Sequence, residues 1–226
     1  MRILGLDTST KFFTIGIYDN TKSYGYSLEV GRKLSALITG TIARVLDAAG
    51  LNIRDIDYFA CGLGPGSFTG MRVGVATIKA LSWSLKKPII GISTLDILSR
   101  NVDAPQCSVI PAIDAKRGLL YCAIYRKQND NFKKLSPDML LTPEALFKKA
   151  PQGSIVLGDA VGLYRDKFLS KIKNAIIADY DFWYPKPHNI IRLALDKLKL
   201  GKNGLSNAFN IEPTYLYPKE CQIKNR

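Results

Sequence analysis

The stretch most suggestive of chemistry is CGLGPGSFTGMRVG, residues 61–74, which is unusually rich in glycine. A glycine-rich turn that opens a helix often holds a phosphate, because its backbone N–H groups and the positive end of the helix dipole both face the anion. Counted from Gly64, both the P-loop and the dinucleotide fingerprint require glycine where Thr69 stands, and no Lys-Ser or Lys-Thr pair follows. The glycines therefore predict another role.

Two aspartates, Asp7 and Asp114, each follow a strand-like segment and open a polar turn. Amides of the first turn, with Thr8 and Ser9, could hold a phosphate while Asp7 orients a metal-bound water, as an ATP-dependent kinase-like enzyme requires. The alternative is that each aspartate is structural and accepts hydrogen bonds from turn amides. We favour the second interpretation, a vestigial nucleotide turn.

Hydrolytic chemistry lacks its usual residues. A catalytic zinc site needs about three protein ligands, but the chain has a single histidine, His188, and no H-x-x-x-H pair. Ser67 does not stand in a G-x-S-x-G elbow and is more simply a helix cap. Neither a catalytic residue nor a metal site is therefore expected.

Composition sets broad limits. A chain of 226 residues, 46% of them apolar, suffices for one large domain or two small lobes. The four cysteines lack C-x-x-C or zinc spacing, which predicts reduced core thiols in a cytoplasmic protein without membrane spans. The net charge of +13 suggests nucleic acid, an acidic protein or a membrane surface as a partner. The lysines are nevertheless spread along the chain, without a dense basic block.

An internal repeat predicts the architecture. ILGLDTSTKFFTIGIY, from Ile3, and IPAIDAKRGLLYCAIY, from Ile110, match in pattern without a gap. Each indicates a strand, an aspartate, a polar turn and a second strand. We therefore expect an N-terminal lobe over residues 1–103 and a C-terminal lobe over residues 104–226, whose last segment could pack back onto the first lobe.

The elements that follow support an α/β fold with a mixed sheet flanked by helices in each lobe. Apolar periodicity predicts helices over residues 32–49 and 69–85, and a helix from Thr142 and Pro143 follows in the second half. Strands are expected over residues 22–30, 57–63, 87–92, 130–136 and 154–159, and a last helix over residues 185–201.

A strand, an aspartate turn and a second strand in each lobe resemble the duplicated actin, sugar kinase and Hsp70 fold, called ASKHA. In that superfamily the turns hold ATP, but here Lys116 and Arg117 replace the usual small residues. GLGPGSFTGMRVGVATIKALSW, followed by GISTLDIL and PAIDAKRGLLYCAIY, resembles the TsaB (YeaZ) family. The chain departs from that family at Leu34, where a histidine is common.

The resemblance implies a non-catalytic subunit in the synthesis of threonylcarbamoyladenosine beside the anticodon of tRNAs. It implies that the chain binds and activates the catalytic subunit TsaD, that the ATPase TsaE regulates the assembly, and that the free protein could form a homodimer. tRNA would be met through the complex. No cofactor is expected, and ATP or ADP could lodge only at the interface of the complex. Related proteins were once called glycoproteases, which leaves a metallopeptidase as a weaker alternative.

Small residues on the two first-lobe helices indicate where a partner could dock. A glycine inside a helix costs about 1 kcal/mol relative to alanine, so Gly70 and Gly74 need a compensating contact. They could pack inside the lobe, or against a helix of a partner, as the resemblance implies. We expect the second, with Gly64, Pro65 and Gly66 forming the tight turn before the helix. The predicted interface consists of Ala36, Gly40, Ala43, Gly66, Ser67, Phe68, Gly70, Met71, Gly74 and Thr77.

Overall fold

The computed structural model describes residues 1–103, 106–128 and 131–218. Contacts between Cα atoms divide the chain into two compact units. The first contains Met1–Ile97 and Pro185–Pro213, and the second contains Leu98–Tyr184 together with Thr214 and the residues after it. The sequence placed the division near residue 103 and allowed the last segment of the chain to pack back onto the first lobe. The contacts assign residues 185–213 to the first unit.

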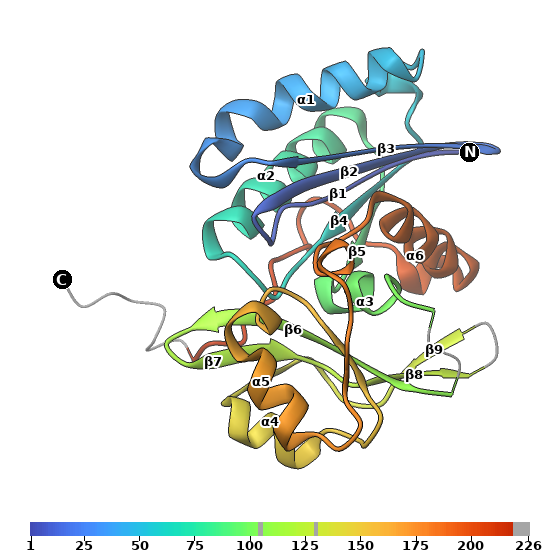
Figure 1. Ribbon diagram of the computed structural model, residues 1–226. Helices are drawn as coiled ribbons and strands as arrows, with labels where there is room; N and C mark the ends of the chain where they lie inside the picture. Colours follow the sequence, from blue (N-terminus) through green and yellow to red (C-terminus); the bar gives the residue numbers. More distant parts are fainter. Residues whose placement is uncertain (104–105, 129–130, 219–226) are drawn as a thin grey trace. The chain divides into compact units, whose positions relative to one another are not determined.

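The first unit is built on a five-stranded mixed sheet in the order β3-β2-β1-β4-β5 (Figure 1). The three antiparallel strands form a meander, and the two others run parallel to β1. Asp7 ends β1 opposite Thr14 of β2, so the turn between them lies at the edge where parallel strands end. The strands are β1 (Arg2–Asp7), β2 (Phe12–Asp19), β3 (Lys22–Glu29), β4 (Tyr58–Gly62) and β5 (Ile89–Ile92).

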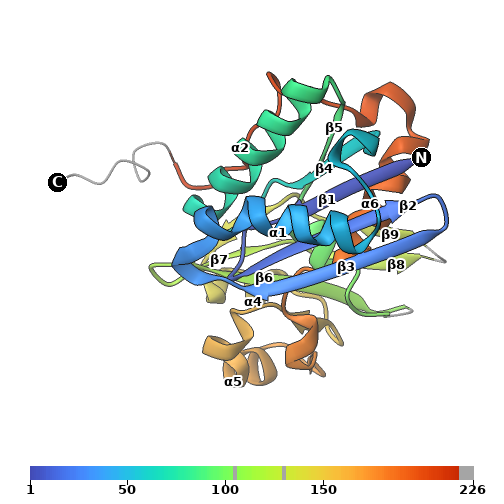
Figure 2. The same cartoon turned by 90° about the horizontal axis from the view of Figure 1, so that it is seen from above.

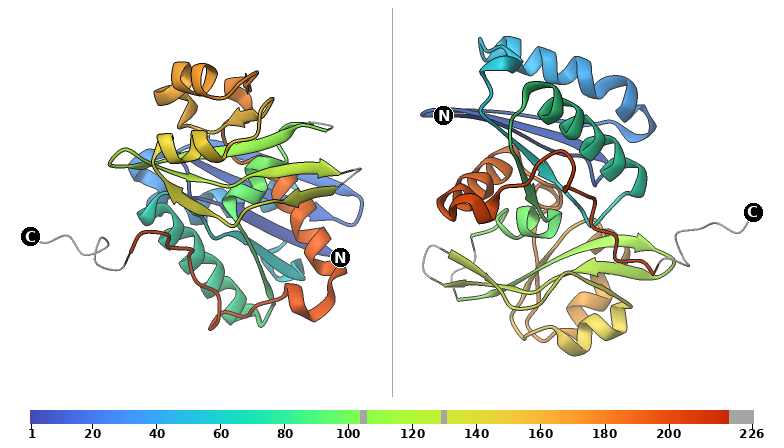
Figure 3. Two further views of the ribbon diagram at one scale, coloured as in Figure 1. Left: turned by 90° about the horizontal axis from the view of Figure 1, so that it is seen from below. Right: turned by 180° about the vertical axis from the view of Figure 1, so that it is seen from behind.

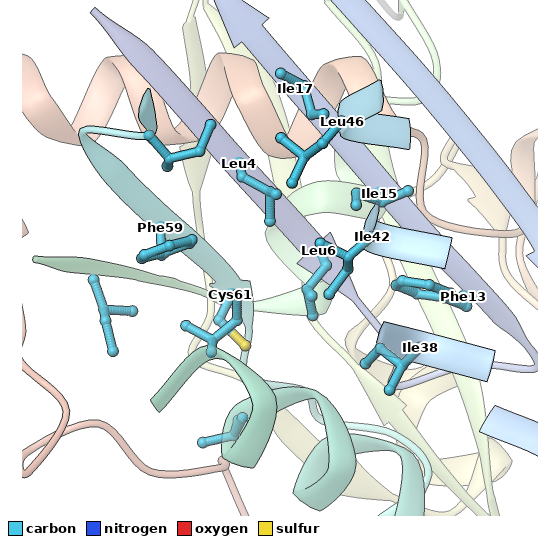
Figure 4. Close-up of a cluster of buried hydrophobic side chains, with 14 of the residues drawn as sticks. Leu4, Leu6, Phe13, Ile15, Ile17, Ile38, Ile42, Leu46, Phe59 and Cys61 are labelled. Atoms are coloured by element: carbon cyan, nitrogen blue, oxygen red, sulfur yellow. The ribbon is translucent and has the colours of Figure 1, made fainter. Parts of the chain in front are cut away.

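Two helices, α1 (Leu34–Ala48) and α2 (Phe68–Leu85), cover one face of this sheet, and Figure 2 shows both from above. Leu6, Ile15 and Ile42 are among the side chains that form the core between helices and sheet (Figure 4). Leu34, which replaces the common family histidine, is buried in this core at the start of α1. The apolar periodicity thus predicted both helices, but it did not predict which side of α2 is buried.

A third helix, α6 (Pro187–Lys199), covers the opposite face of the same sheet (Figure 1). A Cβ on Gly16 or Gly25 would collide with Pro187, so glycines in β2 and β3 let the start of α6 lie directly on the strands. The sequence predicted this helix but placed it in the second lobe. Local periodicity reveals an amphipathic helix without revealing which sheet it covers, and the contacts assign α6 to the first unit.

The second unit repeats the order of the first, as β10-β7-β6-β11-β12. Its hairpin strands are β6 (Ser108–Lys116) and β7 (Leu119–Cys122). Beyond β7 the chain pairs again with β6 as β8 (Tyr125–Gln128), where the first unit has one continuous strand. The remaining strands are β9 (Asn131–Lys134), β10 (Met139–Leu141), β11 (Ile155–Leu157) and β12 (Ile176–Ile177).

Helices α4 (Pro143–Lys149) and α5 (Val161–Lys171) cover one face of the second sheet, as the left view of Figure 3 shows. Thr142 caps α4 by accepting a hydrogen bond from the N–H of Ala145, and Pro143 occupies the first turn, as predicted. Sequence patterns missed α5, whose polar residues and kink at Tyr164 weaken the helical signal.

The duplicated α/β fold, with a mixed sheet flanked by helices in each unit, is therefore confirmed. A short helix, α3 (Thr94–Ser99), follows β5. Cys61 and Cys122 are buried free thiols and Cys107 is partly buried, whereas Cys221 lies outside the described residues. Within the described ranges, no helix combines the length and the apolar character that crossing a bilayer requires.

Candidate functional site

The turn after β1 is a closed hydrogen-bond network around Asp7. Both the N–H and the hydroxyl of Ser9 donate to Oδ1 of Asp7, at 2.8 and 2.7 Å. The hydroxyl of Thr94, which begins α3, donates to Oδ2 at 2.6 Å. All three residues are buried, so the carboxylate is satisfied entirely by the protein.

Glycines within residues 61–74 allow the start of α2 to pack closely against this turn. A Cβ on Gly62 would overlap the carboxylate of Asp7, and one on Gly66 would overlap the carbonyl oxygen of Ser9. Gly70 has no room for a side chain because the carbonyl oxygen of Thr8 occupies it. Two hydrogen bonds join the segments: Ser67 N–H donates to the carbonyl of Ser9 at 2.6 Å, and Thr8 Oγ1 donates to the carbonyl of Gly70 at 2.8 Å.

These contacts correct the prediction for part of the interface. Gly70, Met71 and Gly74 are buried, and Gly74 faces Thr8 and Leu6 of its own unit. Gly70 and Gly74 therefore allow α2 to pack closely against the turn after β1. This is the alternative in which the glycines pack inside the lobe. Gly64, with φ of 91°, makes the turn before α2 as expected, because this backbone conformation suits glycine.

Burial changes the acid–base behaviour of the turn. Because the charged carboxylate has lost its water, the pKa of Asp7 is raised above its ordinary value of 3.8, although the bonds from Thr94 and Ser9 oppose the shift. Burial and the nearby Asp7 also raise the pKa of Cys61. A carboxylate so enclosed can brace the turn. In this arrangement it offers no open position to a phosphate or to a metal-bound water.

The equivalent turn of the second unit is more open and is built on a pair of carboxylates. Asp159, after β11, accepts a 2.8 Å hydrogen bond from the N–H of Asp114. Lys116 reaches back to Oδ2 of Asp114 at 2.5 Å, and this bond raises the pKa of the lysine. Burial raises the pKa of Asp159. Asp114 is thus held by its own turn and by Lys116.

The tip of this hairpin has left-handed backbone at Lys116 and Arg117, with φ of 65° and 54°. Such φ values are uncommon outside glycine, asparagine and aspartate. The hydroxyl of Tyr217 donates to the carbonyls of Ala115 and Lys116, at 2.9 and 3.2 Å. Tyr217 therefore braces the hairpin tip, a contact that the sequence did not reveal.

The outer side of α1 is lined by small residues, as predicted. Ala36, Gly40 and Ala43 are exposed, and a Cβ on Gly40 would meet nothing within 4 Å. At the start of α2, Ser67 and Phe68 are exposed too, and the Arg72 guanidinium lies 3.8 Å from the centre of the Phe68 ring. These residues share the side of the sheet on which both helices lie.

On α2 the exposed side differs from the predicted one. Apart from Phe68, it consists of residues outside the predicted interface. Thr77 is partly buried and donates to the carbonyl of Val73. Helical periodicity separates two small-residue sectors on α2 but does not say which one faces the sheet. Trp83 could have indicated the exposed side of α2. Its side chain is 68% exposed, although tryptophan side chains are on average largely buried. The exposed residues of α2 are Phe68, Thr69, Arg72, Ala76, Ala80, Trp83 and Ser84.

The residues considered for hydrolytic chemistry are Ser67 and His188. Ser67 caps α2 by accepting a 3.2 Å hydrogen bond from the N–H of Gly70, as expected. His188 lies at the surface at the start of α6. Partial loss of hydration, together with the positive charges of Lys186 and Arg192, lowers its pKa. Among the described residues, no three His, Cys, Asp or Glu side chains gather as metal ligands would.

Known proteins resemble the chain along most of its length. The model of the TsaD family, tRNA N6-adenosine threonylcarbamoyltransferase, matches residues 28–198. The Escherichia coli (strain K12) tRNA threonylcarbamoyladenosine biosynthesis protein TsaB is 28% identical over 223 residues, which are 96% of this chain and 94% of that protein. The Bacillus subtilis (strain 168) protein of the same name is 27% identical over 231 residues, covering 99% and 97% of the two chains.

Solved structures support the fold. YeaZ from Pseudomonas aeruginosa superposes with a TM-score of 0.82 at 23% identity, covering 95% of this chain and 99% of that one. The family model, the relatives and this fold agree with the motifs at residues 61–74 and 110–125. The chain therefore belongs to the TsaB (YeaZ) proteins of the TsaD family.

Proposed function

We propose that the chain is a non-catalytic subunit in the biosynthesis of threonylcarbamoyladenosine in tRNA, and that it acts by binding and activating TsaD. The observation that carries the proposal is the closure of the first turn by α2. Asp7 is fully buried, and Gly62, Gly66 and Gly70 leave no space between the turn and the helix. The relatives named TsaB connect the chain to the tRNA modification.

The docking surface in this proposal is the outer side of α1 and α2. Ala36, Gly40 and Ala43 let the backbone of another helix approach α1 closely, since none carries more than a methyl group. TsaD is a suitable occupant because the TsaD family model spans both helices of this chain. A TsaD chain is thus expected to carry an equivalent helix pair.

Other parts of the proposal follow from this arrangement. The free protein pairs with a second copy through the same helices, and the ATPase TsaE regulates the assembly with TsaD. Any ATP or ADP binds at the interface of the complex. The chain contacts tRNA only as part of the complex, and it acts in the cytoplasm. The excess of positive charge, +13, suits an assembly that handles tRNA.

Association with TsaD is the direct test. Ala43→Leu adds a bulky side chain at the exposed side of α1 and should abolish co-elution with TsaD on a sizing column, because a close-packed contact cannot absorb it. Ser170→Leu, a similar change at an exposed position of α5, is the matched control and should leave co-elution intact. Unchanged co-elution of the Ala43→Leu protein would contradict docking on α1.

Absence of catalysis is tested on the purified chain alone. ATP hydrolysis should remain at background, because Asp7 is enclosed by its own turn. Turnover that disappears in Asp7→Asn would contradict the proposal and restore the kinase-like alternative. This isosteric change is preferable to alanine because it fills the same space beside Gly62.

A further inference from the structure

Two large aromatic side chains of the first unit are exposed beside α2. Trp83, in the last turn of the helix, is 68% exposed, and Phe209, in the segment after α6, is 75% exposed. Fully burying such a side chain is strongly favourable. Neither residue belongs to the core or to the closed turn, so both are available to a partner.

The segment that carries Phe209, residues 205–213, is here called the strap. Figure 3 shows it after α6, running beside α2. Ser206 and Ile89 exchange two backbone hydrogen bonds, which tie the strap to the outer edge of β5. Lys79 of α2 donates to the carbonyl of Ile211 at 3.1 Å, which ties the strap to the helix.

This bond attaches the strap to α2 one helical turn before Trp83. Trp83 lies one helical turn after Lys79, and Phe209 lies two residues before Ile211. Residues four apart on a helix share a side. On the strap, Ala208 and Ile211, which lie one residue before and two residues after Phe209, are buried against the core. The strap therefore extends the exposed side of α2 at the end that carries Trp83.

The strap holds Phe209 in a defined position. The side-chain oxygen of Asn207 accepts hydrogen bonds from the N–H groups of Phe209 and Asn210, at 2.8 and 3.1 Å. Such a turn orders the backbone before any partner arrives, which reduces the entropy lost on binding. Aromatic residues with these properties often dominate the affinity of an interface.

Charge favours TsaD over a second copy as the occupant. The two helices contain three basic residues, Arg44, Arg72 and Lys79, and a single acidic residue, Asp47. Pairing this surface with itself would bring like charges together, so the pairing of two copies is expected to be weaker than binding to TsaD. A partner with acidic residues opposite α2 would meet no such repulsion.

The geometry points to Trp83 and Phe209 as aromatic anchors of the TsaD-docking surface, with the strap as its third element beside α1 and α2. This inference rests on the proposed function and deepens it, because it adds a segment far along the chain to the docking site. The acidic side chains of the partner are expected opposite Arg72.

Affinity measurements test the anchors. Phe209→Ala and Trp83→Ala should each weaken binding of the full chain to TsaD at least tenfold in isothermal titration calorimetry. Asn207→Ala keeps the aromatic ring but loosens its turn, and should weaken binding to a smaller extent. Leu163→Ala, at a 63% exposed position of α5, is the matched control and should bind as the wild type does.

The outcomes separate this inference from the proposed function. Melting temperatures should stay unchanged, because both aromatic side chains are exposed. Affinities within threefold of wild type for both alanine variants would overturn the anchors, while loss of binding in Ala43→Leu would still support docking on α1. If the variants impair only self-association, the occupant is a second copy and the inference is wrong. If the wild-type chain does not bind TsaD, both proposals fail.

Discussion

The hydroxyl of Thr8 donates a 2.8 Å hydrogen bond to the carbonyl oxygen of Gly70, and so joins the turn after β1 to the first turn of α2. The same backbone approach leaves no space for a Cβ at Gly70. A single contact thus accounts for a glycine inside a helix and for the closure of the turn that would otherwise be open to a phosphate.

The helix glycines should separate into two kinds. Gly70→Ala should lower stability by about 1–3 kcal/mol, because its Cβ collides with backbone. Gly74→Ala should also destabilise, because its new Cβ would displace the Thr8 hydroxyl from its hydrogen bond to Gly70. Gly40→Ala should instead stabilise by up to about 1 kcal/mol. Thermal melts followed by circular dichroism provide the measurement, and equal melting temperatures for all three would contradict this account.

Asp7 should make stability depend on pH. Its pKa is raised in the folded state, so the folded chain holds this proton more tightly than the unfolded chain does. Stability from this group is therefore present below the unfolded pKa, near 3.8, and is lost as pH rises through the folded pKa. Asp7→Asn, which cannot ionise, should flatten the decline of melting temperature with pH. A decline equally steep in the variant would assign the dependence to other groups.

The two basic residues of the second hairpin should differ in their effect on tRNA. Both residues are exposed at the tip, but Lys116 forms an ion pair with Asp114 at 2.5 Å. If the tip contacts phosphates, Arg117→Glu should weaken tRNA binding by the assembled complex and reduce the salt slope by about one, with Lys116→Glu having a smaller effect. Filter binding at several salt concentrations measures the slope. Identical slopes in all proteins would exclude the tip from the tRNA surface.

Tyr217 should stabilise the second hairpin. Tyr217→Phe removes the hydroxyl that donates to Ala115 and Lys116 but keeps the ring that packs edge-on against Tyr121, with centroids 6.1 Å apart. The expected loss is about 0.5–1.5 kcal/mol, measured by urea unfolding. Tyr217→Ala should cost more, because the ring contact is lost as well. Equal losses would show that the hydroxyl alone matters.

Several features could be predicted from the sequence because they depend on neighbours along the chain. The repeat at Ile3 and Ile110, the helices over residues 32–49 and 69–85, and the cap at Thr142 all reflect alternation, helical period or a local hydrogen bond. The same local patterns carried the family resemblance. They also identified Gly40 and Ala43 as small residues opposite the buried side of α1.

Other features depend on residues far apart in the sequence, and only the tertiary structure decided them. The sequence alone does not say whether Gly70 and Gly74 lie at the surface or in the core. The structure places both against Thr8, which follows β1. Helix α6 has the amphipathic pattern of any covering helix, and only its fit to Gly16 and Gly25 assigns it to the first sheet. A periodic pattern reports that a side is buried. What buries it depends on contacts that the pattern does not encode.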